Sequence, residues 1–424
     1  MELCMKRFGY FEQIKHGQVL GLSVLAMALH LGASNAMAMG DGGNGCVPSI
    51  ELGSGTIADT SAPLFGLDID GDYAFVVDLR RTMTAIDITD LSAPVMVGSM
   101  SLLGFAPFTR NVRVVDGVAY LTRQVTEGAD FAGLLLIDVS SPESMSLMSV
   151  SRVDSAFNVE VDGNMAYVMN RTNQLHMIDV GDSFTPLLIG ALTAPGVITD
   201  VDVVDGIAYM ICEGVGLVVA DVSDPTSAKI LGSFEMPNST LDIEVQGSIA
   251  YIADSDAGLM MIDIQVPTAP VFVDFRTIPN GAKQLSVSGD SVHVLENASD
   301  NNPGLWSFDI SSGIPLGVYR GTSRWLNNVK AIGDTAFLVF QDEGSGAVEG
   351  LKTIDVTNLC NTSCPMDAPC PADLNHDGVL NSFDISAFLG FYNAQDLRAD
   401  FTCDGYFNFF DLSLWLSEFS NGCQ

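Results

Sequence analysis

A unit of four short strands recurs along most of this 424-residue chain, and the recurrence restricts the possible folds more than any other feature. The clearest copy covers residues 201–234, where β-branched and aromatic runs are separated by Gly, Asp and Pro, as in strands joined by turns. We expect its strands at 201–204, 208–211, 216–222 and 229–234. One such sheet cannot bury both of its faces alone, so neighbouring copies must pack against each other.

Two sequence markers count seven units. An aromatic residue or His lies in the second strand of each unit, and an Asp ends each third strand. The markers are Phe75, Tyr120, Tyr167, Tyr209, Tyr251, His293 and Phe337, and then Asp87, Asp138, Asp179, Asp221, Asp263, Asp309 and Asp355, with successive Asp markers 41 to 51 residues apart. Four-stranded units of this period are typical of propeller blades, so we predict an all-β, seven-bladed β-propeller over residues 46–360.

The seventh unit lacks a fourth strand, and a matching segment stands at the other end of the chain. Residues 48–54 repeat the pattern of residues 229–233, part of the fourth strand of the clearest copy. We therefore predict that an N-terminal strand completes the last blade and closes the ring. In this alignment Cys46 and Cys360 fall at adjoining positions, which predicts a disulfide between them.

Residues 1–38 have the features of a secretory signal. Basic residues precede an apolar run at 19–33, and Ala36-Met37-Ala38 fits a cleavage site. The alternative is an uncleaved anchor. With cleavage, the mature protein is secreted, extracellular or at the cell surface, and no transmembrane segment remains.

The net charge restricts the classes of partner, and the cysteine content indicates the compartment in which the protein acts. The formal net charge of −34 disfavours nucleic acid and anionic membranes as partners and favours cations. Cys212 lies in an apolar strand and is predicted to be a buried free thiol. The other six cysteines of the mature chain suit three bridges in an exported protein, with many pairings open. Cys370 and Cys423 bracket the tail and are one candidate pair, whereas Cys364 and Cys403 are left unassigned.

The repeated units also carry a family likeness. The segments Gly-Ile-Ala-Tyr-Met at 206–210 and Gly-Leu-Val-Val-Ala-Asp-Val-Ser-Asp-Pro at 216–225 resemble LVIVP repeats, which occur in bacterial cell-surface and secreted propellers. The likeness extends over about residues 48–360 and departs in the second, third, sixth and seventh units by insertions or by loss of the Asp-Pro turn. It implies the propeller architecture and no single activity.

Arginines gather in or beside the links that should share one face of the ring. These links join second to third strands and each outer strand to the next inner strand. The arginines are Arg80, Arg81, Arg110, Arg123, Arg152, Arg171, Arg276, Arg320 and Arg324, with Trp325 among the aromatics nearby. This pattern favours a binding face for carboxylate, sulfate or sugar hydroxyl groups on a polysaccharide or protein. The alternative is that the arginines pair with neighbouring Asp or cap loop carbonyls.

Two rows of polar residues recur on the expected inner strands. The first row is Asn111, Asn158, Asp200, Asp242, Gln284 and Asn328, with Gly66 in the first blade. The second row lies two residues later, at Asp68, Arg113, Glu160, Asp202, Glu244, Ser286 and Lys330. Because side chains alternate along a strand, both rows should line the central channel. They could hold a cation or other ligand, or only provide the polar lining that a wet channel requires.

No catalytic residues are assigned from the sequence. The mature chain keeps only His176, His293 and His376, and it has no Gly-x-Ser-x-Gly, zinc-spaced His pair or phosphate loop. Catalysis by a pair of Asp residues stays open as an alternative.

After a cysteine-containing linker at 361–370, residues 371–424 carry the most specific chemical pattern. Two 12-residue calcium loops start 27 residues apart, at Asp373 and Asp400. Their predicted ligands are Asp373, Asn375, Asp377, Val379, Asn381 and Asp384, and then Asp400, Thr402, Asp404, Tyr406, Asn408 and Asp411. This spacing brings hard oxygen atoms to one point, as calcium requires, so calcium is the predicted cofactor.

An amphipathic helix is expected after each loop, and this tandem arrangement resembles a dockerin. The resemblance implies attachment to a cohesin-like or other surface protein through residues just before the last ligand, here Ser382-Phe383 and Phe409-Phe410. These differ from the usual small hydroxyl pair. The alternative is that calcium only folds a small terminal module. We expect an exported, non-enzymatic binding or scaffold protein, with a propeller hydrolase or lyase acting on an acidic polysaccharide as the alternative.

Overall fold

The structure is a computed structural model in which the described residues are 50–56, 64–78, 82–102, 111–123, 133–236, 239–278, 280–297, 303–310, 315–320, 323, 325–342, 348–356, 372–374, 379–393, 399, 401 and 409–421. The chain divides into the units Met1–Asn44 and Gly45–Gln424. The first unit, which contains the predicted signal, lies outside the described residues, as do Cys46, Cys360, Cys370 and Cys423. Both predicted disulfides therefore stay predictions.

The strands form seven four-stranded antiparallel sheets. Blade 1 contains β2 (Leu64–Asp70), β3 (Tyr73–Asp78), β4 (Thr82–Asp87) and β5 (Val95–Ser101). Blade 2 contains β6 (Val112–Val115), β7 (Val118–Arg123), β8 (Gly133–Asp138) and β9 (Ser146–Arg152). Blade 3 contains β10 (Ala156–Asp162), β11 (Met165–Asn170), β12 (Gln174–Asp179) and β13 (Leu187–Thr193). Blade 4 contains β14 (Ile198–Val204), β15 (Ile207–Cys212), β16 (Gly216–Asp221) and β17 (Lys229–Glu235).

Blade 5 contains β18 (Thr240–Gln246), β19 (Ile249–Asp254), β20 (Gly258–Asp263) and β21 (Val271–Thr277). Blade 6 contains β22 (Ala282–Ser288), β23 (Ser291–Glu296), β24 (Gly304–Asp309) and β25 (Pro315–Arg320). Blade 7 contains β26 (Trp325–Ile332), β27 (Thr335–Asp342), β28 (Val348–Asp355) and β1 (Ile50–Thr56). Short 3-10 helices, η2 (Pro142–Ser144) and η3 (Pro225–Ser227), precede the outer strands of blades 2 and 4.

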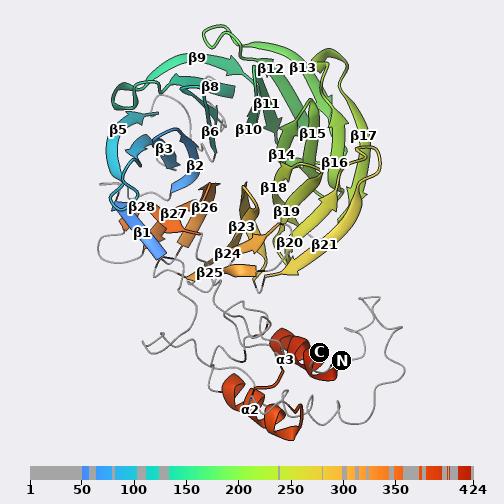
Figure 1. The fold of residues 1–424 in the computed structure, drawn as a ribbon. Coiled ribbons are helices and arrows are strands. Elements are labelled where there is room, and N and C mark those ends of the chain that lie inside the picture. The colour runs from blue at the N-terminus through green and yellow to red at the C-terminus, as the bar shows by residue number, and fades with distance from the viewer. Residues whose placement is uncertain are drawn as a thin grey trace. The chain divides into compact units, whose positions relative to one another are not determined.

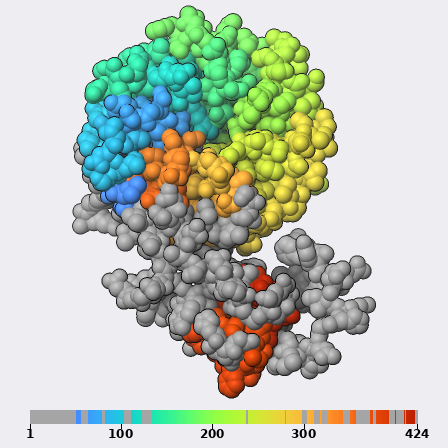
Figure 2. All heavy atoms as spheres, viewed as in Figure 1, coloured from blue at the N-terminus to red at the C-terminus, as the bar shows by residue number. Residues whose placement is uncertain are grey.

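The blades follow one another around a common centre, with the first strand of each blade innermost (Figure 1). In the space-filling view they follow the ring in chain order, from blue through green to orange (Figure 2). The predicted all-β, seven-bladed propeller is thereby confirmed.

Ring closure uses the two ends of the propeller sequence. Strand β1 pairs antiparallel with β28, from Ile50 opposite Asp355 to Thr56 opposite Gly350. A side chain at Gly53 would clash with backbone carbonyl groups of blade 1, including that of Leu91. Thr353 Oγ1 donates to Leu91 O at 2.6 Å and so links β28 to the same turn. The predicted N-terminal strand is confirmed, with its bounds shifted by two residues.

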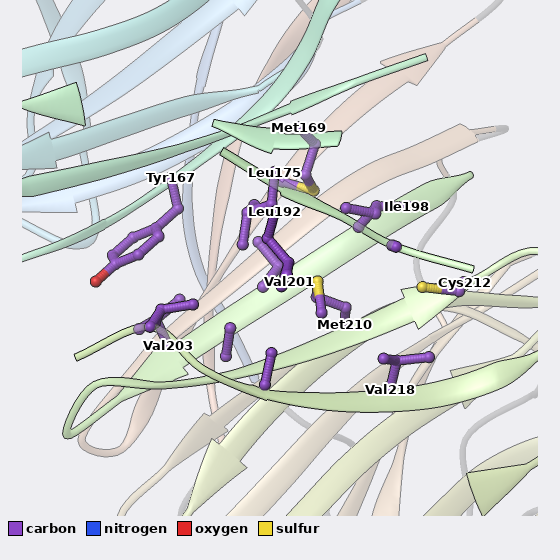
Figure 3. Packing of buried hydrophobic residues seen from close by; sticks show 14 of the residues in the cluster. Tyr167, Met169, Leu175, Leu192, Ile198, Val201, Val203, Met210, Cys212 and Val218 are labelled. Atoms are coloured by element: carbon purple, nitrogen blue, oxygen red, sulfur yellow. The ribbon is translucent and has the colours of Figure 1, made fainter. Parts of the chain in front are cut away.

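The hydrophobic core lies between blades, because each sheet packs both faces on neighbours. Between blades 3 and 4, Leu175, Val201 and Met210 are almost completely buried (Figure 3). Cys212 joins this cluster at 2% exposure, and burial raises the pKa of its thiol to about 12. The predicted buried free thiol is confirmed. Burying a large apolar side chain such as Leu175 or Met210 stabilises the fold by roughly 1.5–3 kcal/mol.

Two helices are described in the tail, α2 (Ser382–Asn393) and α3 (Phe409–Asn421). The ring of Phe388 in α2 stacks on Trp415 in α3 with centroids 4.6 Å apart, and both side chains are buried. Helices are therefore present in both predicted regions, each starting before the last predicted calcium ligand of its loop. Among the described helices, none is long and apolar enough to cross a membrane.

Candidate functional site

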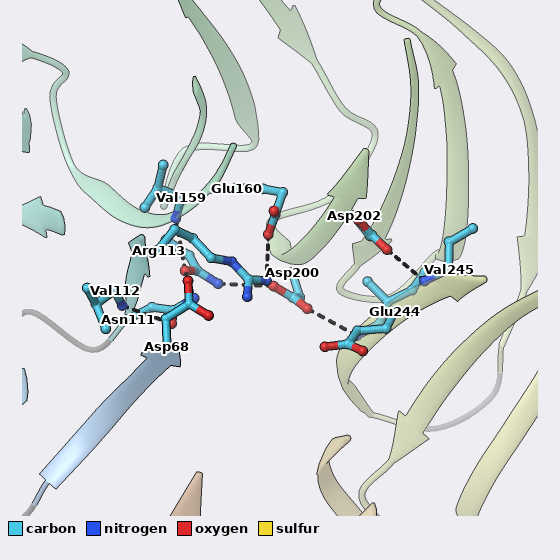
Figure 4. Close-up of polar contacts among 12 residues, drawn as sticks. Asp68, Asn111, Val112, Arg113, Val159, Glu160, Asp200, Asp202, Glu244 and Val245 are labelled. Carbon is cyan, nitrogen blue, oxygen red and sulfur yellow. Dashed lines mark hydrogen bonds and ion pairs between the residues drawn. The ribbon is translucent and has the colours of Figure 1, made fainter. Parts of the chain in front are cut away.

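The inner strands place two rows of polar side chains on the channel wall because residues alternate between faces. In β14, Val201 and Val203 point into the core between blades, so Asp200 and Asp202 face the channel. Arg113, Glu160 and Glu244 reach the same space from β6, β10 and β18 (Figure 4). The structure thus brings together the two rows that the sequence predicts.

Carboxylates of both rows bind the backbone of the following blade. Asp200 accepts a hydrogen bond from Ile243 N at 3.0 Å, and Asp242 accepts one from Leu285 N at 2.7 Å. The second row repeats this contact at 2.6 Å, where Asp68 accepts from Val114 N, Asp202 from Val245 N and Glu244 from Val287 N. These amide groups would otherwise have no partner strand on the channel side. The polar rows therefore connect neighbouring blades.

Side chains of the first row also bind one another around part of the ring. Asn111 donates to Asn158 at 2.6 Å, and Asn158 donates to Asp200 at 3.0 Å. Burial and the adjacent Asp242 carboxylate hold the pKa of Asp200 well above its usual range. Asn328 donates to Phe65 O at 2.8 Å and continues the network from blade 7 to blade 1.

The second row forms a mixed-charge cluster around a cavity of 230 Å³. Arg113 pairs with Glu160 at 2.5 Å, and Lys330 pairs with Glu244 at 3.5 Å. Burial raises the pKa of Glu160 to about 7, although Arg113 acts in the opposite sense. Burial also raises the pKa of Glu244. Across the described part of the chain, no group of three or more His, Cys, Asp or Glu is placed to hold a metal ion.

The predicted arginine face is only partly described. The side chains of Arg80, Arg81, Arg110, Arg123, Arg320 and Arg324 lie outside the described residues. Arg276 pairs with Asp274 at 2.7 Å, which matches the alternative interpretation of these arginines. Arg171 lies over the Phe157 ring at 4.8 Å. Trp325 is 36% exposed at the start of β26.

A cavity of 480 Å³ opens beside Arg152, where blade 2 leads into blade 3. Seven of its nine lining residues have polar side chains, the full lining being Arg152, Val153, Asp154, Ser155, Asn170, Thr172, Gln174, His176 and Leu188. Of these, only Arg152 is among the predicted binding residues. The signal that could have identified this site is Gln174 and His176, since blade 4 has Gly216 and Val218 at the same positions.

In the tail, backbone amide groups of the first predicted calcium loop hold the side chain of its last predicted ligand, Asp384. The Asp384 carboxylate accepts hydrogen bonds from Leu374 N at 3.1 Å and Asn381 N at 2.9 Å and is completely buried. Asp411, its counterpart, is equally buried, and Asp373 is 6% exposed. Oriented, buried carboxylates at loop positions 1 and 12 fit a calcium site. The predicted ligands Asn375, Asp377, Asp400, Thr402, Asp404, Tyr406 and Asn408 lie outside the described residues.

The blade geometry agrees with a match to a known repeat family. The LVIVD repeat model matches residues 66–101, 128–152, 155–193, 195–235 and 238–275, which fall in blades 1 to 5. The chain carries LVIVD repeats. The matched repeat is of the LVIVD type rather than the expected LVIVP type, and Leu-Val-Val-Ala-Asp at 217–221 lies within one of the matched segments.

A likeness to a solved structure concerns the fold only. The computationally designed Ika8 protein is 11% identical, with a TM-score of 0.50, and the match covers 72% of this chain and 99% of that one. No curated protein is significantly similar to the sequence.

Proposed function

We propose that this protein is an exported, non-enzymatic binding protein whose propeller holds a ligand and whose tail attaches it to a partner in a calcium-dependent way. The proposal rests on a contrast between two sets of described polar side chains, those of the channel and those of the cavity beside Arg152. Channel carboxylates such as Asp202 and Glu244 already bind backbone amides of the next blade. The cavity beside Arg152, in contrast, is open and is lined by several polar side chains that could orient a small ligand.

The LVIVD repeats suit such a role, because propellers present loops and cavities on a rigid ring. The two Asp residues that an acid–base mechanism would most readily use, Asp200 and Asp242, both accept backbone hydrogen bonds. This use favours a structural role for the pair over a catalytic one.

The attachment role rests on the tail. Asp373, Asp384 and Asp411 would hold calcium with the other loop residues, because buried carboxylate oxygens at these loop positions are ligands that calcium prefers. Phe383 and Phe409, at the starts of α2 and α3, are 70% and 56% exposed. Exposed aromatic side chains on a small module favour a protein partner.

The test is capture of partners from the envelope and secreted fractions of the producing cell by the full mature chain, with calcium or with chelator. We expect a partner that is captured only with calcium and is lost when Phe383 and Phe409 are both changed to Ser. Phe184→Ser is the matched control, since Phe184 is 68% exposed on the propeller. Capture that is indifferent to calcium and to the tail variant would contradict the attachment role.

A further inference from the structure

The cavity between blades 2 and 3 has a lining that differs from the standard blade pattern. The third strands of blades 2, 4, 5 and 6 begin with Gly at 133, 216, 258 and 304, whereas β12 begins with Gln174. At Gly216, with φ +108°, a side chain would clash with the backbone of β17. Blade 3 accommodates Gln174 because Asn173, at φ +66°, takes the left-handed conformation and donates to Ala194 O at 2.8 Å.

We propose that this cavity binds a neutral sugar residue, or a ligand with the same array of hydroxyl groups. The inference rests on the proposed binding function and names the ligand class of its propeller site.

A network of side chains gives the cavity fixed donors and acceptors. Asn170, 3% exposed, accepts from Thr172 N at 3.0 Å and Gln174 N at 2.9 Å through its Oδ1. Its Nδ2 lies 3.3 Å from Gln174 Oε1 and 3.1 Å from His176 Nε2. Because an amide nitrogen can only donate, His176 accepts at Nε2 and carries its proton on Nδ1.

The imidazole is therefore a neutral donor that is not yet satisfied. His176 Nδ1 is buried and has no hydrogen-bond partner among the described residues. Burial also lowers the pKa of His176, although Asp154 acts in the opposite sense. A buried donor without a partner costs about 1–3 kcal/mol, and His176 lines the cavity, so a small displacement of the ring that lets a ligand oxygen reach Nδ1 would gain affinity.

Charge balance and size favour a neutral ligand. Arg152 and Asp154 both line the cavity, so one carboxylate opposes the one guanidinium among its described lining residues. Sugar hydroxyls donate and accept at once, which suits a carboxylate, amides, an imidazole and a guanidinium together. Leu188, 46% exposed, adds an apolar edge for a C–H face. The volume of 480 Å³ lies within the range of small-ligand sites, about 300–1,000 Å³.

The test measures binding of glucose, galactose, mannose and their short oligomers to the full mature protein by calorimetry, with the matching uronic acids as charged probes. The variant Gln174→Gly/His176→Val installs the residues of blade 4 at these positions. The variant Asp154→Ala alters an exposed side chain and should leave folding unchanged. Lys229→Gln, which removes an exposed ion pair with Asp221 outside this cavity, is the matched control.

We expect a neutral sugar to bind, with affinity at least about tenfold weaker in both cavity variants and unchanged in the control. Binding that survives both cavity variants, or a preference for uronic acids, would overturn the proposal. If no sugar binds while partner capture persists, the ligand class is wrong and the binding function stands. If both fail, the proposed function fails too.

Discussion

His293 in blade 6 should make the stability of the propeller depend on pH in a way that one substitution removes. The imidazole is completely buried at the position where blades 4 and 5 have Tyr209 and Tyr251. Its Nδ1 lies 2.7 Å from Ser307 Oγ, and burial lowers its pKa from 6.5 to about 4. The unfolded chain therefore binds a proton at a higher pH than the folded protein does.

The direction of the pH dependence of stability follows from this lowered pKa. Stability from neutral His293 is fully present above about pH 6.5 and is lost as pH falls toward 4, since the unfolded state then binds more protons. At about 1.4 kcal/mol per pKa unit, the whole loss is about 3 kcal/mol, of which about 2 kcal/mol should appear between pH 7 and 4.5.

The assay compares wild type with His293→Tyr/Ser307→Val by urea unfolding at several pH values. This variant reproduces the cross-strand pair Tyr209 and Val219 of blade 4. Other titrating groups act on both proteins, so the difference between them isolates His293. We expect the variant to gain about 2 kcal/mol relative to wild type on acidification.

Ser307→Ala is the control, because it removes the hydroxyl and keeps the imidazole. It should be less stable by about 1 kcal/mol and retain the acid-dependent loss. A difference between wild type and the double variant that stays constant from pH 7 to 4.5 would refute a buried, neutral His293. Titration of the His293 ring near pH 6.5 by NMR would refute it directly.

Three further predictions concern the ring, the channel and the tail. Gly53→Val should displace β1 and cost about 1–3 kcal/mol of unfolding free energy in denaturant titrations, whereas the exposed Ser54→Val should not. Because the pKa of Glu160 is raised to about 7, its contribution is full below pH 4.5 and falls as pH rises through 7, so Glu160→Gln should flatten the decline of Tm from pH 5 to 8. Removing calcium should expose buried Trp415 and shift its fluorescence to the red. The Asp384→Ala variant should show the same red shift with calcium present. An unchanged spectrum in chelator would count against the calcium loops.

The ring-lock disulfide gives a fourth test at residues outside the described part of the chain. Cys46→Ser should lower Tm markedly under oxidising conditions, since the cross-link would join the two ends of the propeller sequence. An equal Tm for variant and wild type under those conditions would contradict the Cys46–Cys360 pairing.

The blades could be predicted because their information is local. Period-2 patterns around Val201 and Val203, turns such as Asp205-Gly206, and the recurrence of the whole unit each specify strands without reference to distant residues. Ring closure could also be predicted, because Gly53 aligns with Gly232, which lies in the outer strand of blade 4. The same alternation placed Asp200 and Asp202 on the channel wall.

The sequence by itself determined the number of blades, the strand that closes the ring and which residues line the channel. Only the tertiary structure decided how those residues are used. The bond from Ile243 N to Asp200 spans 43 residues, and its length depends on how two sheets pack rather than on either strand. Likewise, Arg152 ends one blade and His176 lies in the next, so the cavity that they share exists only once blades 2 and 3 are packed together.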